Sequence, residues 1–307
     1  MSLRVIFLGT AAGVPTRKRS LPAILLQREG EQLMFDCGEG VQRQMLIAKT
    51  SLNKITKIFI SHMHGDHVMG LPGLLQTMAL LGRERKLDIY GPAKIREFMQ
   101  GISRTVQFVL TFQVKIHKIK RAGIVCQEKE YAVHAVRSKH VITSFAYAYV
   151  EKSRPGPFYP ERAKALGVSE GPLWSKLQKG KEIKLPTGES VRPEDVMGQP
   201  RLGRKIVYTG DTRPFRGLKV FAEGADMLIH DSTLGDELAA RAEEYGHSTV
   251  DQAAESAKEA GVKQLVLTHI SQRYEDTSKW LEQARKIFKN AVVAEDFTRI
   301  EIPLLEK

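Results

Sequence analysis

The sequence predicts an α/β protein with two sheets covered by outer helices. Short apolar runs of strand type recur along the 307 residues, and they dominate the first 150. After residue 205, strand-like runs alternate with segments of helical periodicity, a pattern typical of layered α/β folds. The chain is 42% hydrophobic and 27% charged. This composition is ordinary for a folded protein with a sizeable core, and it argues against global disorder.

Each expected element lies between turn-forming or capping residues. Strands are expected at residues 5–8, 23–26, 33–35, 58–60, 87–90, 141–150, 206–209, 227–230 and 265–268. Helices are expected at residues 71–81, 92–102, 249–260 and 280–288. Pro92 suits the first position of a helix, and Ser248 or Thr249 suits the N-cap of the third helix.

Residues 152–200 interrupt this pattern. They contain seven prolines and six glycines and allow only short helices or hairpins. Because a structureless loop of that length is uncommon inside a compact core, we expect an insertion that projects from a single domain formed by residues 1–307. Between residues 152 and 184, eight basic residues accompany three acidic ones, with Tyr159 and Trp174 among them. The segment is either an arm that binds nucleic acid or a lid or disordered insertion without that role.

The positive charge is concentrated in the first part of the chain. The net charge is +12, and residues 1–121 carry 19 Lys and Arg against 8 Asp and Glu. A polyanionic partner and simple solubility both explain such an excess. No segment approaches the roughly 20 apolar residues of a membrane helix. Two cysteines give no disulfide framework, so we expect a cytoplasmic protein without a membrane partner.

The strongest chemical signal follows the expected strand at residues 58–60. Three histidines and one aspartate occur within six positions: His62, His64, Asp66 and His67. Where a strand ends and the chain turns, alternate residues such as His62 and His64 can point to one centre while Asp66 and His67 point to another. Imidazole nitrogen and carboxylate oxygen together suit zinc, and by ligand type also manganese or iron.

Two neighbouring metal ions need about seven ligands, so further ligands are expected elsewhere in the chain. Three residues occur at comparable places: His140 precedes an expected strand, whereas Asp211 and His269 follow strands. A lone His or Asp at a strand end is usually a cap or a surface residue. The cluster at residues 62–67 requires partners, and this favours a ligand role for all three.

These residues carry a resemblance to the metallo-β-lactamase superfamily and, within it, to the short-form ribonuclease Z family. The shared motifs are SHMHGDH at 61–67, LPGLL at 71–75, FDCGEG at 35–40, GDT at 210–212, HST at 247–249 and LTHIS at 267–271. The resemblance implies a metallo-β-lactamase αββα sandwich with a projecting arm. It implies that residues 152–200, with Gly171 and Pro172, are similar to the flexible arm by which the family grips the body of transfer RNA.

The resemblance also implies a cofactor and partners. It assigns two zinc ions to each subunit, the first bound by His62, His64 and His140, the second by Asp66, His67 and His269, with Asp211 as the bridge. It implies a homodimer that acts on precursor tRNA. The implied reaction is endonucleolytic removal of the 3′ trailer, which leaves a 3′-hydroxyl on the tRNA and a 5′-phosphate on the trailer.

The resemblance implies further roles for individual residues. Asp66 would orient or deprotonate the attacking water, and His247 would protonate the leaving oxygen. Asp231 would assist His247, although the family has a Glu there. Arg17, Lys18 and Arg19 form a loop similar to one that contacts the 3′ end of the substrate, and all three can bind phosphate.

Two other functions remain open at the level of sequence. One is a small-molecule phosphodiesterase or another dinuclear metallo-hydrolase of the same fold, for which a basic arm would have no use. The other is a non-catalytic RNA-binding protein that keeps metal for structure. The arm together with residues 17–19 argues against the first, and His247 beside a complete ligand set argues against the second.

Overall fold

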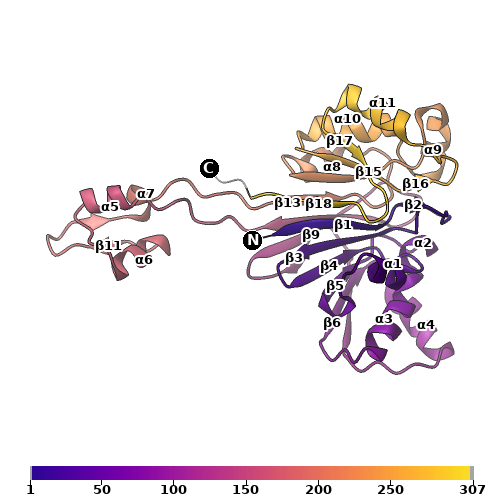
Figure 1. Cartoon of the computed structure of the whole chain (residues 1–307), viewed down its shortest axis with the longest axis horizontal. Helices are drawn as coiled ribbons and strands as arrows, with labels where there is room; N and C mark the ends of the chain where they lie inside the picture. Colours follow the sequence, from indigo (N-terminus) through magenta and orange to yellow (C-terminus); the bar gives the residue numbers. More distant parts are fainter. Residues whose placement is uncertain (1, 305–307) are drawn as a thin grey trace. The chain divides into compact units, whose positions relative to one another are not determined.

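The computed structural model describes residues 2–304. The chain divides into two compact units, the larger comprising residues 2–150 and 205–304 and the smaller residues 151–204 (Figure 1). Each unit has its own hydrophobic core.

The larger unit contains two seven-stranded sheets. The first has the order β18 (Arg299–Glu301), β1 (Leu3–Gly9), β3 (Ala23–Arg28), β4 (Glu31–Phe35), β5 (Ile55–Phe59), β6 (Leu87–Gly91) and β7 (Val114–Lys118). The second has the order β17 (Ala291–Val293), β15 (Leu265–Thr268), β14 (Met227–Asp231), β13 (Lys205–Tyr208), β10 (Phe145–Glu151), β9 (Tyr131–Arg137) and β8 (Gly123–Gln127). Strands β4 to β7 are parallel to one another, as are β13, β14, β15 and β17. The carboxyl ends of the strands in each group therefore lie at the same edge of the sheet.

Alternating side chains place one core between the sheets and another outside each sheet. In β1, Val5 and Phe7 belong to the core that also contains Phe59 and Tyr147, whereas Ile6 packs outward. The outer core of the first sheet is closed by α1 (Val41–Ile47), α3 (Gly70–Leu80) and α4 (Ile95–Thr105). That of the second is closed by α8 (Arg216–Ala222), α10 (Val250–Ala260) and α11 (Ser278–Ile287). These four layers confirm the predicted αββα sandwich (Figure 1).

The remaining elements of the larger unit are short. They are β2 (Ala11–Ala12), which pairs with β16 (Ile270–Ser271), the helices α2 (Gly65–Val68) and α9 (Ala239–Tyr245), and the 3-10 turns η1 (Leu52–Lys54) and η2 (Asp236–Leu238). Within residues 2–304, no helix combines the length and apolar character needed to span a membrane.

Two expected elements have different boundaries in the structure. The strand expected at residues 141–150 is β10, which begins only at Phe145; the preceding segment turns and leaves Val141 and Ile142 exposed. The helix expected at residues 92–102 is α4, which begins at Ile95 and continues to Thr105. Pro92 lies in the turn before it and accepts a hydrogen bond from the Ile95 amide. The expected N-cap of α10 is confirmed as Thr249, whose side chain accepts from the Gln252 amide.

The smaller unit has its own secondary structure. It contains α5 (Pro160–Ala165), α6 (Pro172–Gln178) and α7 (Pro193–Val196), each with proline at its first position, and a hairpin of β11 (Ile183–Lys184) and β12 (Ser190–Val191). Seven buried apolar residues form its core: Ala163, Val168, Leu177, Ile183, Leu185, Val191 and Val196. Three of the seven prolines therefore begin helices, and the segment is not without structure.

The two chain segments that begin and end the smaller unit are paired along their length. The Glu151 carboxylate accepts two hydrogen bonds from the Arg204 guanidinium, at 2.7 and 2.8 Å, and both side chains are buried. Farther along, a Cβ atom on Gly156 would lie 2.0 Å from the Gly198 carbonyl oxygen. Such an approach is possible only without a side chain, so this glycine allows the two segments to run close together.

Candidate metal centre and active site

The candidate site residues come from the ends of strands in both sheets. The cluster at 62–67 follows β5, whereas Asp211 follows β13 and His269 follows β15. Ligand sites are common at the carboxyl ends of parallel strands because several chain segments end there together. His269 has a φ of +62°, an unusual conformation for a residue other than glycine. The fold therefore brings residues far apart in sequence to one place.

The first group of donor atoms comprises His62 Nε2, His64 Nδ1, His140 Nε2 and one oxygen of Asp211. His64 Nδ1 lies 3.0 Å from His62 Nε2 and 3.2 Å from His140 Nε2, and Asp211 Oδ2 lies 3.5 Å from His62 Nε2. Burial lowers the pKa of all three histidines, most strongly that of His62. Neutral imidazoles keep the lone pairs that a metal ion requires.

The second group comprises Asp66, His67 and His269. His67 Nε2 lies 3.3 Å from His269 Nε2, and Asp66 Oδ2 lies 3.4 Å from each of these nitrogens. The other oxygen of Asp211, Oδ1, is 3.3 Å from His67 Nε2 and 3.4 Å from His269 Nε2. The Asp211 carboxylate therefore stands between the two groups, with one oxygen facing each.

The donor set fits metal ions. Asp211 Oδ1 is buried and accepts no well-formed hydrogen bond from residues 2–304, although burial of an unsatisfied polar atom is unfavourable. Burial acts to raise the pKa of Asp211, but His269, His67 and His62 lower it well below its usual value, so the carboxylate is charged. Converging imidazole nitrogens around a buried carboxylate match the preferred ligands of a divalent transition-metal ion.

A layer of outer hydrogen bonds, which the sequence analysis did not identify, orients the candidate ligands. Asp36 Oδ2 accepts from His67 Nδ1, Ser61 Oγ and the Tyr208 hydroxyl, each at 2.7 Å. Three further ligands use their second nitrogen in the same way: His62 Nδ1 with Ser61 Oγ, His140 Nδ1 with the Gly246 carbonyl, and His269 Nδ1 with Thr233 Oγ1. Such partners fix the ring orientation and leave the other nitrogen for a metal ion. Asp36 lies in the FDCGEG motif at 35–40, which carried the resemblance but indicated no role for this side chain.

His247 lies beside the two donor groups but is held by a different carboxylate. Its Nδ1 donates to Asp231 Oδ2 at 2.8 Å, so Asp231 reaches it although aspartate is a short acid. Asp231 is itself fixed by donors from Thr212 and Thr233. Burial lowers the pKa of His247, but the Asp231 carboxylate outweighs this effect and raises it to about 9. His247 is therefore protonated at neutral pH.

An open cavity of about 370 Å³ gives access to this centre. His64, Asp66, Asp211, His247 and His269 line it, together with Arg241, Tyr245 and Arg273. The two arginines place positive charge at the mouth of the cavity. The cavity is therefore suited to an anionic group that must reach the donor residues.

The loop with Arg17, Lys18 and Arg19 divides into exposed and buried parts. Arg17 and Lys18 are exposed, whereas Arg19 is only 9% exposed. The Arg19 Nη1 donates to Thr10 Oγ1 at 2.8 Å and to the Ala294 carbonyl at 2.6 Å. Arg19 thus fastens the base of the loop, and only its two neighbours are free to contact a ligand.

Arg19→Ala is expected to lower the free energy of unfolding by about 2 to 3 kcal/mol, because two hydrogen bonds from a charged donor are lost and a buried carbonyl loses its partner. Lys18→Ala is the matched control and should stay within about 0.5 kcal/mol of the original protein. Urea unfolding in the presence of a chelator measures both. Equal effects of the two substitutions would contradict the buried role of Arg19.

Gly171 and Pro172 lie in the smaller unit at the start of α6, and both are exposed. Gly171 has a φ of 142°, which glycine adopts without strain, and Pro172 occupies the first helical position. The structure therefore presents this pair at the start of a helix.

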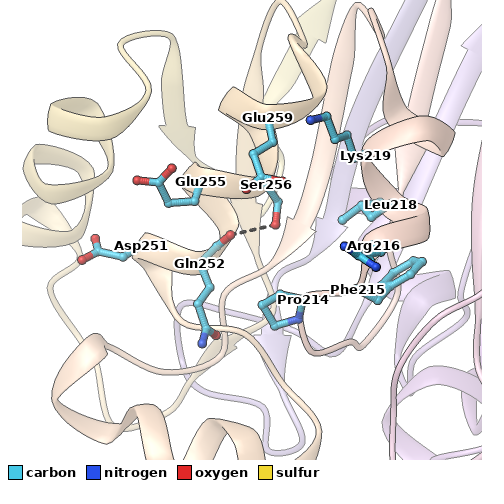
Figure 2. Close-up of a pocket in the computed structure, with 10 residues that line it drawn as sticks. All are labelled: Pro214, Phe215, Arg216, Leu218, Lys219, Asp251, Gln252, Glu255, Ser256 and Glu259. Atoms are coloured by element: carbon cyan, nitrogen blue, oxygen red, sulfur yellow. Dashed lines mark hydrogen bonds between the residues drawn. The ribbon is translucent and has the colours of Figure 1, made fainter.

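A second cavity of about 370 Å³ lies between α8 and α10 (Figure 2). Asp251, Glu255 and Glu259 line its α10 side, and Ser256 Oγ donates to the Gln252 carbonyl at 2.8 Å, as Figure 2 shows. None of the predicted site residues lies here. Three carboxylates outnumber the two cations of the lining, Arg216 and Lys219, so the net charge of this cavity disfavours a polyanion.

Comparison with known proteins agrees with the fold. Residues 186–270 match the family model of the β-lactamase superfamily domain, and residues 3–153 match the family described as anti-Pycsar protein Apyc1. The crystal structure of the short form of human tRNase Z superposes with a TM-score of 0.73 at 32% identity, over 98% of this chain and 99% of the human chain. The fold is thus that of the metallo-β-lactamase superfamily.

Curated relatives place the chain more narrowly. It is 49% identical to a ribonuclease Z of Methanosarcina acetivorans and 47% identical to one of Methanosarcina mazei, each over 302 residues and 98% of both chains. The chain belongs to the ribonuclease Z family.

Proposed function

We propose that this protein is an endoribonuclease that removes the 3′ trailer from precursor tRNA. The observation that carries the proposal is the pair of donor groups joined by Asp211, with His247 beside them, in a chain of the ribonuclease Z family. Cleavage would leave a 3′-hydroxyl on the tRNA and a 5′-phosphate on the trailer. A small-molecule phosphodiesterase is not favoured, because relatives named ribonuclease Z match the chain over nearly its full length.

We propose that the resident metal is zinc and that two ions bind. His62, His64 and His140 would hold one ion, Asp66, His67 and His269 the other, and Asp211 would contact both. When bound, zinc supplies a Lewis acid next to the phosphate and lowers the pKa of a water molecule towards neutrality. Elemental analysis of the purified protein would test both the metal identity and the number of ions.

The side chains divide the proton transfers between them. Asp66 Oδ2, which accepts a hydrogen bond from the Gly13 amide at 3.0 Å, would orient the attacking water and take its proton. As the new bond to phosphorus forms, the bond from phosphorus to the ribose 3′ oxygen breaks. His247 would give its proton to that oxygen through Nε2, because Nδ1 is engaged with Asp231.

Incubation of a precursor tRNA carrying a 3′ trailer with the metal-loaded protein tests the function. Mapping of both new ends should locate one cut after the discriminator nucleotide, with a 3′-hydroxyl upstream and a 5′-phosphate downstream. Hydrolysis of small phosphodiesters without any cut in the precursor would support the alternative function instead.

We propose that the smaller unit is a flexible arm that binds the body of the tRNA. Eight basic residues in it are exposed and suited to phosphate contacts: Lys152, Arg162, Lys164, Lys176, Lys179, Lys181, Lys184 and Arg192. In this proposal, Gly171 and Pro172 form part of the RNA-binding surface, and Arg17 and Lys18 contact the RNA near the metal centre.

Removing the arm is expected to weaken precursor binding while sparing hydrolysis of a small activated phosphodiester. Val150 of β10 pairs directly with Lys205 of β13, so residues 151–204 can be replaced by an Asn-Gly turn that closes the hairpin. Binding of precursor at low salt and hydrolysis of the small substrate are the two measurements. Loss of both activities would mean that the unit supports the sandwich and does not serve as a substrate arm.

A homodimer and a cytoplasmic location complete the proposal. Cys37 and Cys126 are both free and buried, which suits a reducing compartment. Light scattering of the purified protein tests the dimer, and cell fractionation tests the location.

A further inference from the structure

A basic pocket outside the metal centre lies where β7 ends and β8 begins. This surface cavity, here called the β7–β8 pocket, has a volume of about 390 Å³. It is lined by Tyr90, His117, Lys118, Lys120 and Arg121, together with apolar residues. Lys118, Lys120 and Arg121 are exposed, so their charges face solvent. No role described above uses these residues.

The β7–β8 pocket keeps its positive charge because, within residues 2–304, no carboxylate forms an ion pair with Lys118, Lys120 or Arg121. Residues 115–121 contain no acidic side chain. The nearby Asp88 is already engaged: one oxygen lies 2.6 Å from His117 Nε2 and the other 3.0 Å from Lys86 Nζ. The His117 ring also stacks on Tyr90, with a centroid distance of 4.4 Å, which fixes it in the wall of the pocket. An anionic ligand therefore meets three uncompensated charges there.

The β7–β8 pocket lies on the sheet edge that carries the metal centre. Phe59 of β5, Tyr90 of β6 and His117 of β7 are neighbours in the parallel register. His62 follows Phe59 by three residues. Because adjacent strands are about 4.8 Å apart, the end of β7 lies roughly 10 Å to the side of the end of β5.

Strand pairing in the second sheet also places the β7–β8 pocket on the side of the metal centre. The β8 strand pairs with β9, where Gly123 faces Ala135, and β9 then leads to His140. At the opposite end of β8 the charges balance: Glu128 and Glu130 flank Lys129, and Glu128 pairs with Lys57 at 2.9 Å. The excess of positive charge is thus at the end near the metal centre.

We propose that the β7–β8 pocket binds backbone phosphates of the RNA next to the bond that is cut. This inference rests on the proposed function and adds a second contact area to it. The three flexible cations of the pocket suit contacts with phosphates. The Tyr90 ring is covered by His117, so it is not available to stack on a base. Binding here is sequence-independent and weakens with added salt.

The test compares two triple variants with the same change in net charge. One is Lys118→Ala, Lys120→Ala, Arg121→Ala in the pocket. The control is Lys258→Ala, Lys286→Ala, Lys289→Ala. All three lysines are exposed: the first lies on α10, the second on α11 and the third just after α11. The Kd of each for a precursor tRNA with a 3′ trailer is measured over a range of salt concentrations, alongside hydrolysis of a small phosphodiester.

The pocket variant is expected to bind the precursor roughly tenfold more weakly at low salt and to lose about 2 from the slope of log K against log salt, about 0.7 for each lost phosphate contact. The control should keep the slope of the original protein, and both variants should hydrolyse the small phosphodiester normally. A variant with Arg in place of Lys118 and Lys120 should retain binding, since charge is what matters.

The proposal is overturned if the pocket variant and the control have the same Kd and salt slope. That outcome differs from failure of the proposed function, in which the original protein itself would not cut the precursor.

Discussion

Replacing Asp211 by asparagine is expected to reduce precursor cleavage by more than about 10³-fold, beyond what loss of a single hydrogen-bond donor costs in an active site. The reason is that Asp211 is the one carboxylate that faces both donor groups, with Oδ2 3.5 Å from His62 and Oδ1 3.3 Å from His67. An amide keeps the size of the side chain but removes its negative charge and one of its two oxygens, so the shared anionic ligand of the two candidate metal positions is lost.

The measurements are metal content by elemental analysis and cleavage of precursor tRNA. We expect the variant to bind less than the full complement of metal as well as to lose activity. Asp251→Asn, on the outer helix α10, is the matched control and should change neither. An Asp211→Asn protein with full metal content and unchanged cleavage would contradict a shared ligand.

Replacing His247 by glutamine is expected to slow cleavage by about 10² to 10⁴-fold while the metal content stays unchanged, because general acid catalysis contributes on this scale. The imidazole belongs neither to the group with His64 nor to the group with Asp66. It lies in a third possible donor group with Asp211, Asp231 and His269, and there its Nδ1 is held by Asp231 at 2.8 Å. Glutamine fills a similar space but cannot deliver a proton. Loss of metal from this variant would mean that His247 acts as a ligand or supports one.

The pH dependence separates the proton donor from a merely structural histidine. A general acid works in its protonated form, so the rate should fall as pH rises through the pKa of His247, which is raised to about 9. Asp231→Asn removes the charge that raises this pKa, and the alkaline decline should then move to lower pH. An unchanged alkaline decline in the asparagine variant would argue against the pairing.

The outline of the site could be predicted from the sequence because its residues stand at strand ends. His62, Asp211 and His269 each follow an apolar run, and parallel strands in one sheet end at a common edge. His140 was predicted from its place before a strand and His247 from the family resemblance, and no local pattern reveals the distance of either from the centre. Layer order followed from the alternation of strands and helices, and the structure confirms it.

The hydrogen bonds that orient the candidate ligands and the burial of Arg19 could not be predicted from the sequence. Asp36 and Thr233 act through side chains that lie far from their partners in sequence, so only the folded chain shows that they hold His67 and His269. A run of three cations predicts three exposed charges. Tertiary contacts decide otherwise for Arg19, which turns inward to Thr10.

The direct pairing of Val150 with Lys205 also has a consequence for how the chain can fold and evolve. The smaller unit leaves and re-enters the sheet at neighbouring positions, so to the sandwich it is only a long hairpin loop. Lengthening a two-residue loop to this size takes roughly five doublings, and these raise the entropic cost of closing the loop by only about 3 kcal/mol. Because the inserted residues bury a core of their own, segments of quite different length and sequence could occupy this position without disturbing the strands that carry the metal ligands.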